Sequence, residues 1–354
     1  CIYRLFCILL SCKVFICRAY VIILNRVIIT YKGNCINNVA FLSVAWVLLS
    51  LLEGFRSFSV GTDTSAYVSL FKHPRSSLEG GFQLLISLVH KFSNNPTIFL
   101  LVCAFITNGL VLLAIYRMSD NVFLSVYFYV ALYYYFISYN ALRQYLAVAV
   151  LLNAFWYAKQ KKWIKYAIMM LIAVSLHTVA IVGLIYIPIF LGNDEVVSKK
   201  KAILIVGGGI AATLSLDSLM ELLFRIVPQY KIYVGSSYLT DSGGIQQPIV
   251  NTAILLAFIC LSTKKAKEKS PYVLPFLLAV ILSFLQMKLF SAQRFLWCFD
   301  IFSIFLLPSV MLNNRLETKS KTIFNVGVIV AALLFMTYYL NYNYMRVGNY
   351  SFAV

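Results

Sequence analysis

The chain has 354 residues, of which 61% are apolar and only 12% are charged. Soluble domains carry roughly 25% charged and about 45–50% apolar residues, so the composition excludes a soluble enzyme, a disordered tail and a secreted disulfide scaffold. The 30 basic and 12 acidic residues give a net charge of +18. In a membrane protein this excess reflects cytoplasmic loops rich in Lys and Arg, not nucleic-acid binding. The sequence therefore predicts an all-α polytopic membrane protein, with one integral membrane domain over residues 1–354.

Apolar runs of helical length follow one another along the chain. Because a spanning helix needs about 20 mainly apolar residues, these runs predict about 10–12 transmembrane segments. The first, at 3–24, is the least regular because it contains Arg4, Lys13 and Arg18. The other predicted helices lie at about 39–55, 97–116, 121–138, 142–158, 202–224, 249–263, 272–290, 295–312 and 323–341.

One further run, residues 164–191, has His177 near its middle. A single helix there would put the Lys-rich segments on its two sides on opposite faces of the membrane, against the positive-inside rule. A reversal at 175–178 puts them on one face, but each arm is then only about 18–21 Å long, too short to cross about 30 Å of hydrocarbon. Broken helices are tolerated where protein or a water-filled cavity surrounds them. We predict a broken helical hairpin with His177 at its tip, near the outer surface.

Two external loops are predicted, at 56–96 and 226–248. The first contains a Gly-Thr-Asp-Thr turn at 61–64 and a short amphipathic stretch at 82–92, and the second is polar and rich in glycine. The eight cysteines form no CxxC pair and are interpreted as small apolar residues of hydrophobic segments. Because the acidic residues form no cluster suited to Mg²⁺, we predict neither a metal nor a cofactor.

Two arginines lie at predicted outer helix ends, where membrane topology gives no reason for a cation. Arg143 precedes Gln144, and Arg294 follows Gln293. A guanidinium group binds phosphate oxygens bidentately and keeps its charge, and a helix N-terminus adds backbone donors for the same anion. The alternative for each arginine is interfacial anchoring or an ion pair with one of the few acids.

Arg56 and Asp63 approach the same face from the first external loop. Asp63 is equally suited to be an N-cap or Asx turn for the segment that begins at Ser65. His177 is the only histidine in an apolar helical context. It is either a hydrogen-bonded structural residue or, because of its place opposite the arginines, a general base.

In this order the residues resemble the EpsG/Wzy-type polysaccharide polymerases of bacterial capsule and exopolysaccharide pathways. The resemblance extends over about residues 39–312. It rests on Gly54-Phe55-Arg56, Gly61-Thr62-Asp63 with Tyr67, Glu79-Gly80, Arg143-Gln144 followed by Leu146-Ala147, Leu176-His177-Thr178 and Arg294.

The resemblance implies a membrane glycosyltransferase of the bacterial cytoplasmic (inner) membrane, with its active face outside the cytosol. Its donor and acceptor would be oligosaccharide repeat units linked to undecaprenyl pyrophosphate, and a chain-length regulator is an optional further partner. On this hypothesis arginines replace a metal as the electrostatic clamp on the leaving pyrophosphate. The expected roles are pyrophosphate binding by Arg143 and Arg294 with help from Arg56, catalysis by His177 as base, sugar orientation or base chemistry by Asp63, and sugar binding or orientation by Gln144, Tyr67, Glu79 and Gln293.

Two other function classes stay open on the sequence alone. A flippase or transporter of lipid-linked oligosaccharides would be expected to show internal repeats and polar groups near the bilayer midplane. A membrane acyltransferase acting on glycans would be expected to place a second polar partner close to His177 in the sequence. The chain shows no visible repeat, and only Leu176 and Thr178 flank His177.

Overall fold

The computed structural model describes residues 35–191, 207, 211, 244–263, 271–289 and 291–353. Within these residues the structure is helical, and β structure is limited to two isolated bridges, Arg56 with Phe352 and Ser262 with Asn314. The helices up to the hairpin are α2 (Cys35–Gly54), α3 (Thr64–Lys72), α4 (Gly80–His90), α5 (Pro96–Met118), α6 (Val122–Ala131), α7 (Tyr134–Ile137), α8 (Leu142–Lys159) and α9 (Trp163–Leu176). They are followed by η1 (Thr178–Ile185), α10 (Tyr186–Leu191), α14 (Gln246–Leu261), α16 (Val273–Leu285), α17 (Ala292–Leu296), η3 (Asp300–Phe302), α18 (Ser303–Leu312), α19 (Thr318–Asn341) and η4 (Tyr344–Arg346).

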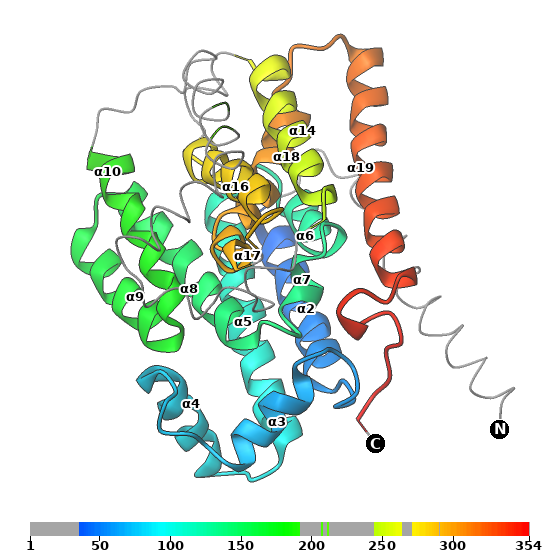
Figure 1. The fold of residues 1–354 in the computed structure, drawn as a ribbon. Helices are drawn as coiled ribbons and strands as arrows, with labels where there is room; N and C mark the ends of the chain where they lie inside the picture. Colours follow the sequence, from blue (N-terminus) through cyan, green and yellow to red (C-terminus); the bar gives the residue numbers. More distant parts are fainter. Residues whose placement is uncertain are drawn as a thin grey trace, which may run out of the picture.

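Four described segments are long and apolar enough to cross a membrane, namely Asn37–Gly54, Pro96–Met118, Ala292–Leu312 and Thr318–Asn341. Shorter apolar helices pack among them (Figure 1). The predicted all-α polytopic membrane fold is confirmed. The predicted helix at 3–24 lies outside the described residues, as does 202–224 apart from residues 207 and 211 and the second external loop apart from 244–248.

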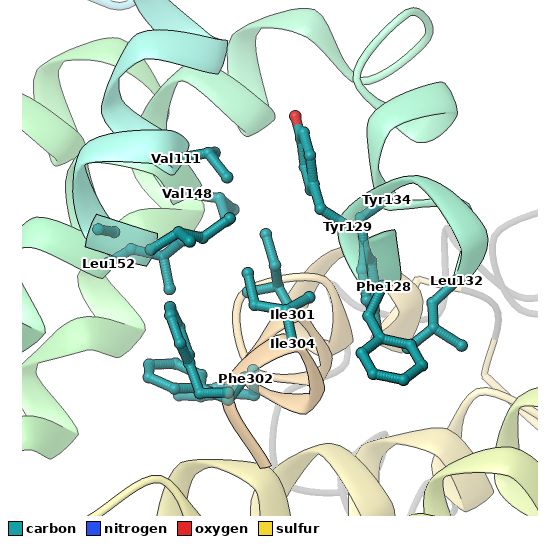
Figure 2. Packing of buried hydrophobic residues seen from close by; sticks show 14 of the residues in the cluster. Val111, Phe128, Tyr129, Leu132, Tyr134, Val148, Leu152, Ile301, Phe302 and Ile304 are labelled. Atoms are coloured by element: carbon teal, nitrogen blue, oxygen red, sulfur yellow. The ribbon is translucent and has the colours of Figure 1, made fainter. Parts of the chain in front are cut away.

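The core surrounds α8, which is buried along almost its whole length and packs against α5 and α9. A helix that is apolar on every side is stable only when protein or lipid covers all of it. The interrupted span from α17 to α18 fills the space between α8 and α6. Figure 2 shows Ile301 and Phe302 of this span between Val148 and Leu152 of α8 and Phe128 of α6.

α2 lies close against α5, and two glycines permit the approach. A Cβ on Gly54 would lie 2.6 Å from the Leu101 Cα, and one on Gly109 would lie 2.9 Å from the Trp46 indole nitrogen. Small residues give such contacts between membrane helices because they let the backbones approach. The Trp46 indole also donates a hydrogen bond of 2.8 Å to the Phe105 carbonyl across this interface.

Two helices predicted as continuous are interrupted. The predicted helix at 121–138 stops at Ala131 and resumes at Tyr134, because Tyr133 adopts a left-handed backbone conformation with φ of 74°. The predicted helix at 295–312 begins earlier, at Ala292, and is divided into α17, η3 and α18. A left-handed residue that is not glycine is uncommon, and here the Tyr133 hydroxyl is bound to the Tyr344 carbonyl at 3.1 Å.

The hairpin predicted around His177 is present. α9 ends at Leu176, and after His177 the chain continues as η1 back along α9, where the Tyr166 hydroxyl donates to the Gly183 carbonyl at 2.9 Å. The predicted loop 56–96 contains α4, where an amphipathic stretch was expected, and also α3, which was not predicted. Figure 1 shows α3 and α4 together at one end of the molecule, below α9 and beside the start of α5.

Candidate active site

Glu79 links the segment 56–96, which was predicted to be an external loop, to the hairpin. Its Oε2 accepts a hydrogen bond from Arg143 Nη1 at 2.7 Å, and its Oε1 accepts one from His177 Nδ1 at 2.8 Å. The Thr178 backbone amide also points at Oε1, at 3.4 Å. The three side chains stay partly accessible, with 27% of Arg143, 15% of Glu79 and 13% of His177 exposed. One carboxylate thus joins three separate segments at a partly wet position.

The close packing of α4 against α9 brings these segments together. A Cβ on Gly81 would lie 2.8 Å from the Ser175 carbonyl oxygen, closer than real Cβ atoms approach. A Cβ on the neighbouring Gly80 would meet nothing within 4 Å. Gly81 is therefore required for α4 to approach the end of α9, and this approach places Glu79 beside His177.

The hydrogen bond fixes which nitrogen of His177 carries a proton. A carboxylate only accepts hydrogen bonds, so Nδ1 is the donor, and in the neutral ring Nε2 keeps its lone pair. Burial lowers the pKa of His177, and the charges of Arg143 and Arg294 add to this effect against the opposing influence of Glu79. The imidazole is thus neutral at neutral pH, with Nε2 as the available base.

Glu79 is ionised under the same conditions. Burial opposes its charge, but hydrogen bonds from its own backbone amide and from His177, together with the charge of Arg143, outweigh burial and hold the pKa of Glu79 below its usual value. The contact with His177 is accordingly a hydrogen bond from a neutral ring to a carboxylate. Arg143 is the positive partner.

Arg143 retains donors beyond those that Glu79 uses. A guanidinium group has five N–H donors, and the buried Nε of Arg143 has no hydrogen-bond partner in the described structure. The group also lies over the Phe82 ring, 5.7 Å from its centroid. Because 27% of its side chain is exposed, Arg143 can contact an anion while it remains paired with Glu79.

Tyr67 and Asp63 border this group on the side of α3. Burial raises the pKa of Tyr67, and the nearby charge of Arg143 opposes that rise while the charge of Asp63 adds to it. Asp63 is exposed and occupies the N-cap position of α3, as one alternative predicted, but its side chain makes no capping hydrogen bond. Asn140 instead holds the turn, because its Oδ1 accepts from the Thr62 hydroxyl at 2.9 Å.

α17 adds Arg294 to the same region. Arg294 is exposed, and its charge acts on His177, which places it near the ring. Gln144, the neighbour of Arg143, donates from its buried side-chain amide to the Arg294 carbonyl. Gln293 lies on the same helix, with its Nε2 3.5 Å from the Tyr344 hydroxyl. Gln144 therefore fastens α17 to α8 and keeps the two arginines on one side of the fold.

Arg56 does not join this group. Its side chain is fully buried, donates to Thr64 Oγ1 at 3.2 Å and to the Tyr139 carbonyl at 3.1 Å, and stacks over the Tyr139 ring. Glu53, also buried, gives Arg56 its backbone carbonyl and accepts hydrogen bonds from Ser138 and Asn108. The pair of Glu53 and Arg56 therefore lies inside the protein. Pyrophosphate binding by Arg56 stays an untested prediction, and the burial of its side chain does not favour it.

Sequence reasoning gave no role to two buried acids, Glu53 and Asp300. Both stand within segments that are apolar enough to span a membrane. The sequence does carry a signal for both acids, because an ionisable group at membrane depth is a functional candidate by default. Within the described residues no three His, Cys, Asp or Glu side chains gather in a metal-binding arrangement. The absence of a metal from the reaction stays a prediction.

A cavity of about 640 Å³ lies between α2 and α5. It is lined almost entirely by apolar side chains, including Leu42, Trp46 and Leu113. It contains none of the predicted site residues.

Comparison with known proteins gives one match. The model of the EpsG family matches residues 39–352, nearly the whole chain. No curated protein and no solved structure matches the chain. The match indicates a membrane protein of the polysaccharide polymerase type.

Proposed function

We propose that this chain, which belongs to the EpsG family, polymerises lipid-linked oligosaccharide repeat units at the outer leaflet of the bacterial cytoplasmic membrane. The observation that carries the proposal is the contact of Glu79 with both Arg143 and His177. It sets a neutral imidazole, oriented by a carboxylate, beside a guanidinium group. Such a site suits a reaction in which a hydroxyl loses a proton while an anion departs.

The proposed step is a glycosyl transfer. A hydroxyl oxygen of the acceptor repeat unit attacks the anomeric carbon of the donor glycan, a new C–O bond forms, and the bond from that carbon to the pyrophosphate oxygen breaks. The hydroxyl proton moves to His177 Nε2, and the bonding electron pair leaves with undecaprenyl pyrophosphate. A positioned base of this kind contributes about 10²- to 10⁴-fold to a rate.

Arg143 and Arg294 bind the departing pyrophosphate in this mechanism. Charge develops on the leaving oxygen, so cations that are already in place stabilise the transition state more than the ground state. The partial exposure of Arg143 and the exposure of Arg294 support the assignment. Glu79 and Gln144 are positioning residues, because Glu79 orients the His177 ring and Gln144 ties the backbone of Arg294 to α8.

Asp63 and Tyr67 are proposed to contact sugar. Asp63 is exposed at the mouth of the group, where a carboxylate can accept hydrogen bonds from sugar hydroxyls. The base role suits His177 better, because an exposed carboxylate is a weak base at neutral pH. A chain-length regulator is a further proposed partner.

The proposal is tested with purified protein in lipid nanodiscs and the lipid-linked repeat unit alone. A ladder of products on a gel, formed without any nucleotide sugar, is the expected result. No ladder, combined with movement of the same lipid across the membrane of sealed vesicles, would support a flippase instead. Transfer of an acyl group to the glycan without chain growth would support the acyltransferase alternative.

A further inference from the structure

A cavity of about 220 Å³ lies beside α17 and is lined by residues of α7, α14, α17, η3, α19 and η4, and by Gln286 directly after α16. One water molecule needs roughly 10–15 Å³ of such space, and pockets for drug-sized ligands begin at about 300 Å³. The volume therefore suits a single small ring. Neither the proposed catalytic step nor the family match assigns this cavity a role.

Asp300 is the acidic residue of the cavity wall. It is 1% exposed and lies where the interrupted span changes from α17 to α18. Its Oδ2 accepts a hydrogen bond of 3.2 Å from Gln247, whereas its Oδ1 is buried and has no hydrogen-bond partner among the described residues. A charged oxygen at this depth is costly unless donors surround it.

Gln286 adds a second acceptor of the same kind. Its side chain is 2% exposed, lines the cavity, and has a buried Oε1 without a partner in the described structure. Two such acceptors in one wall are unusual, because the great majority of buried polar atoms are hydrogen-bonded. They match a ligand that brings several hydroxyl donors.

Aromatic rings form much of the remaining wall. Tyr338 and Tyr342 stand parallel at the end of α19, with ring centroids 6.1 Å apart and planes 9° from parallel. Trp297 and Tyr133 add further ring surface. The C–H face of a pyranose ring packs on such surfaces while its hydroxyl rim donates hydrogen bonds, so rings together with acceptors fit a carbohydrate.

α17 connects the cavity to the candidate active site. Gln293 and Trp297 line the cavity, and Arg294, which follows Gln293 directly, influences His177. The Trp297 ring also meets Tyr145 of α8 edge-on, with centroids 6.3 Å apart. A saccharide held in the cavity would extend past α17 toward the arginines.

We propose that this cavity binds a neutral sugar ring of the oligosaccharide substrate, through Asp300 and Gln286 as acceptors and Tyr342 and Trp297 as ring surfaces. The proposal rests on the proposed polymerase function. It adds a subsite that holds one sugar ring of the substrate while His177 and the arginines act on the reacting bond.

The test is saturation-transfer NMR on the purified full chain in detergent, with the methyl glycosides of glucose, galactose, N-acetylglucosamine and N-acetylgalactosamine as probes. At least one glycoside is expected to receive saturation from the protein. Asp300→Asn and Tyr342→Ala are each expected to weaken its binding about tenfold or more, because the first replaces one of the two acceptor oxygens by a donor and the second removes a ring surface. Asp120→Asn, the same chemical change at an exposed carboxylate, is expected to bind as the unaltered protein does.

Tyr342→Ala keeps the test decisive if Asp300→Asn fails to fold, because the Tyr342 ring is 74% exposed and supports little packing. Binding by none of the four glycosides, or equal binding by the unaltered protein and both cavity variants, would overturn the proposal. A product ladder with no glycoside binding would refute the cavity proposal and leave the polymerase standing. Glycoside binding that depends on Asp300, with no ladder, would support the cavity and refute the polymerase.

Discussion

The chain contains two acid–arginine sites that use the same residue types in opposite ways. Around Glu53, Arg56 is fully buried, and its donors are directed to Thr64 and to carbonyl groups of the protein. Around Glu79, Arg143 and His177 stay partly exposed, and donors on Arg143 remain available. A charged side chain whose hydrogen bonds are all made within the protein stabilises the fold. A charged side chain that stays partly exposed to solvent can bind a ligand.

The sharpest test of this comparison is the same substitution at both acids. Glu79→Gln is expected to lower polymerisation by about 10²-fold or more with little loss of stability, because the carboxylate that orients His177 is gone while its surroundings stay partly solvated. Glu53→Gln is expected to lower the thermal unfolding temperature while each folded molecule keeps its turnover. Product ladders and thermal unfolding of both variants provide the measurement, and equal effects at the two positions would remove the distinction.

The arginines offer a parallel test of smaller size. Arg56→Lys is expected to destabilise the protein by up to about 3 kcal/mol, because lysine cannot reproduce the fork of hydrogen bonds at a buried site. Arg143→Lys is expected to slow turnover by about tenfold and to keep the unfolding temperature, with exposed Arg75→Lys as its control. Unchanged turnover in Arg143→Lys would exclude a bidentate contact with pyrophosphate.

Two adjacent glycines sharpen the account of how the site is assembled. Gly81→Ala forces α4 away from Ser175 and is expected to cost about 1–3 kcal/mol and to reduce activity, since Glu79 moves away from His177. Gly80→Ala has room for its methyl group and is expected to be neutral or slightly stabilising. Thermal unfolding and ladder rates of the pair decide the point, and similar behaviour of the two would contradict the packing argument.

The pH dependence gives the smallest expected effect. Because the pKa of His177 is lowered from its ordinary 6.5, the neutral base persists into mildly acidic solution, and polymerisation is expected to fall only below pH 6.5. Replacing Glu79 by Gln removes the group that favours the protonated ring, so this acid limb moves to lower pH.

The stability of the folded protein is also expected to fall as the pH falls. The pKa of Glu79 is lowered in the folded protein. Its contribution to stability is therefore fully present above pH 4.5 and is lost as the pH falls through the pKa of the folded state. The lowered pKa of His177 likewise makes the protein less stable as the pH falls below 6.5, because the unfolded chain binds the proton more readily. Polymerisation rates and unfolding temperatures across pH 4–8 measure the effects on activity and on stability. A loss of activity that begins above pH 6.5 would contradict the assignment of His177 as the base.

The sequence predicted the membrane fold and the hairpin because both follow from hydrophobic length and the distribution of basic residues. It placed Arg143 and His177 in one site but gave Glu79 a role in sugar binding or orientation, since no local pattern indicates that one carboxylate contacts both of them from a distant segment. The burial of Arg56 arises from Tyr139 and Thr64 packing around it, which is a tertiary property. The helix break at Tyr133 could not be predicted, because no glycine or proline lies there. The structure explains it by the hydrogen bond from the Tyr133 hydroxyl to the Tyr344 carbonyl.

The most direct test of the central claim is the ladder assay on His177→Ala, with and without added imidazole, beside the exposed-histidine variant His73→Ala. The account predicts that His177→Ala loses about 10²- to 10⁴-fold in rate, that imidazole restores part of this loss, and that His73→Ala polymerises like the unaltered protein. A His177→Ala protein that extends chains at the unaltered rate would contradict the account.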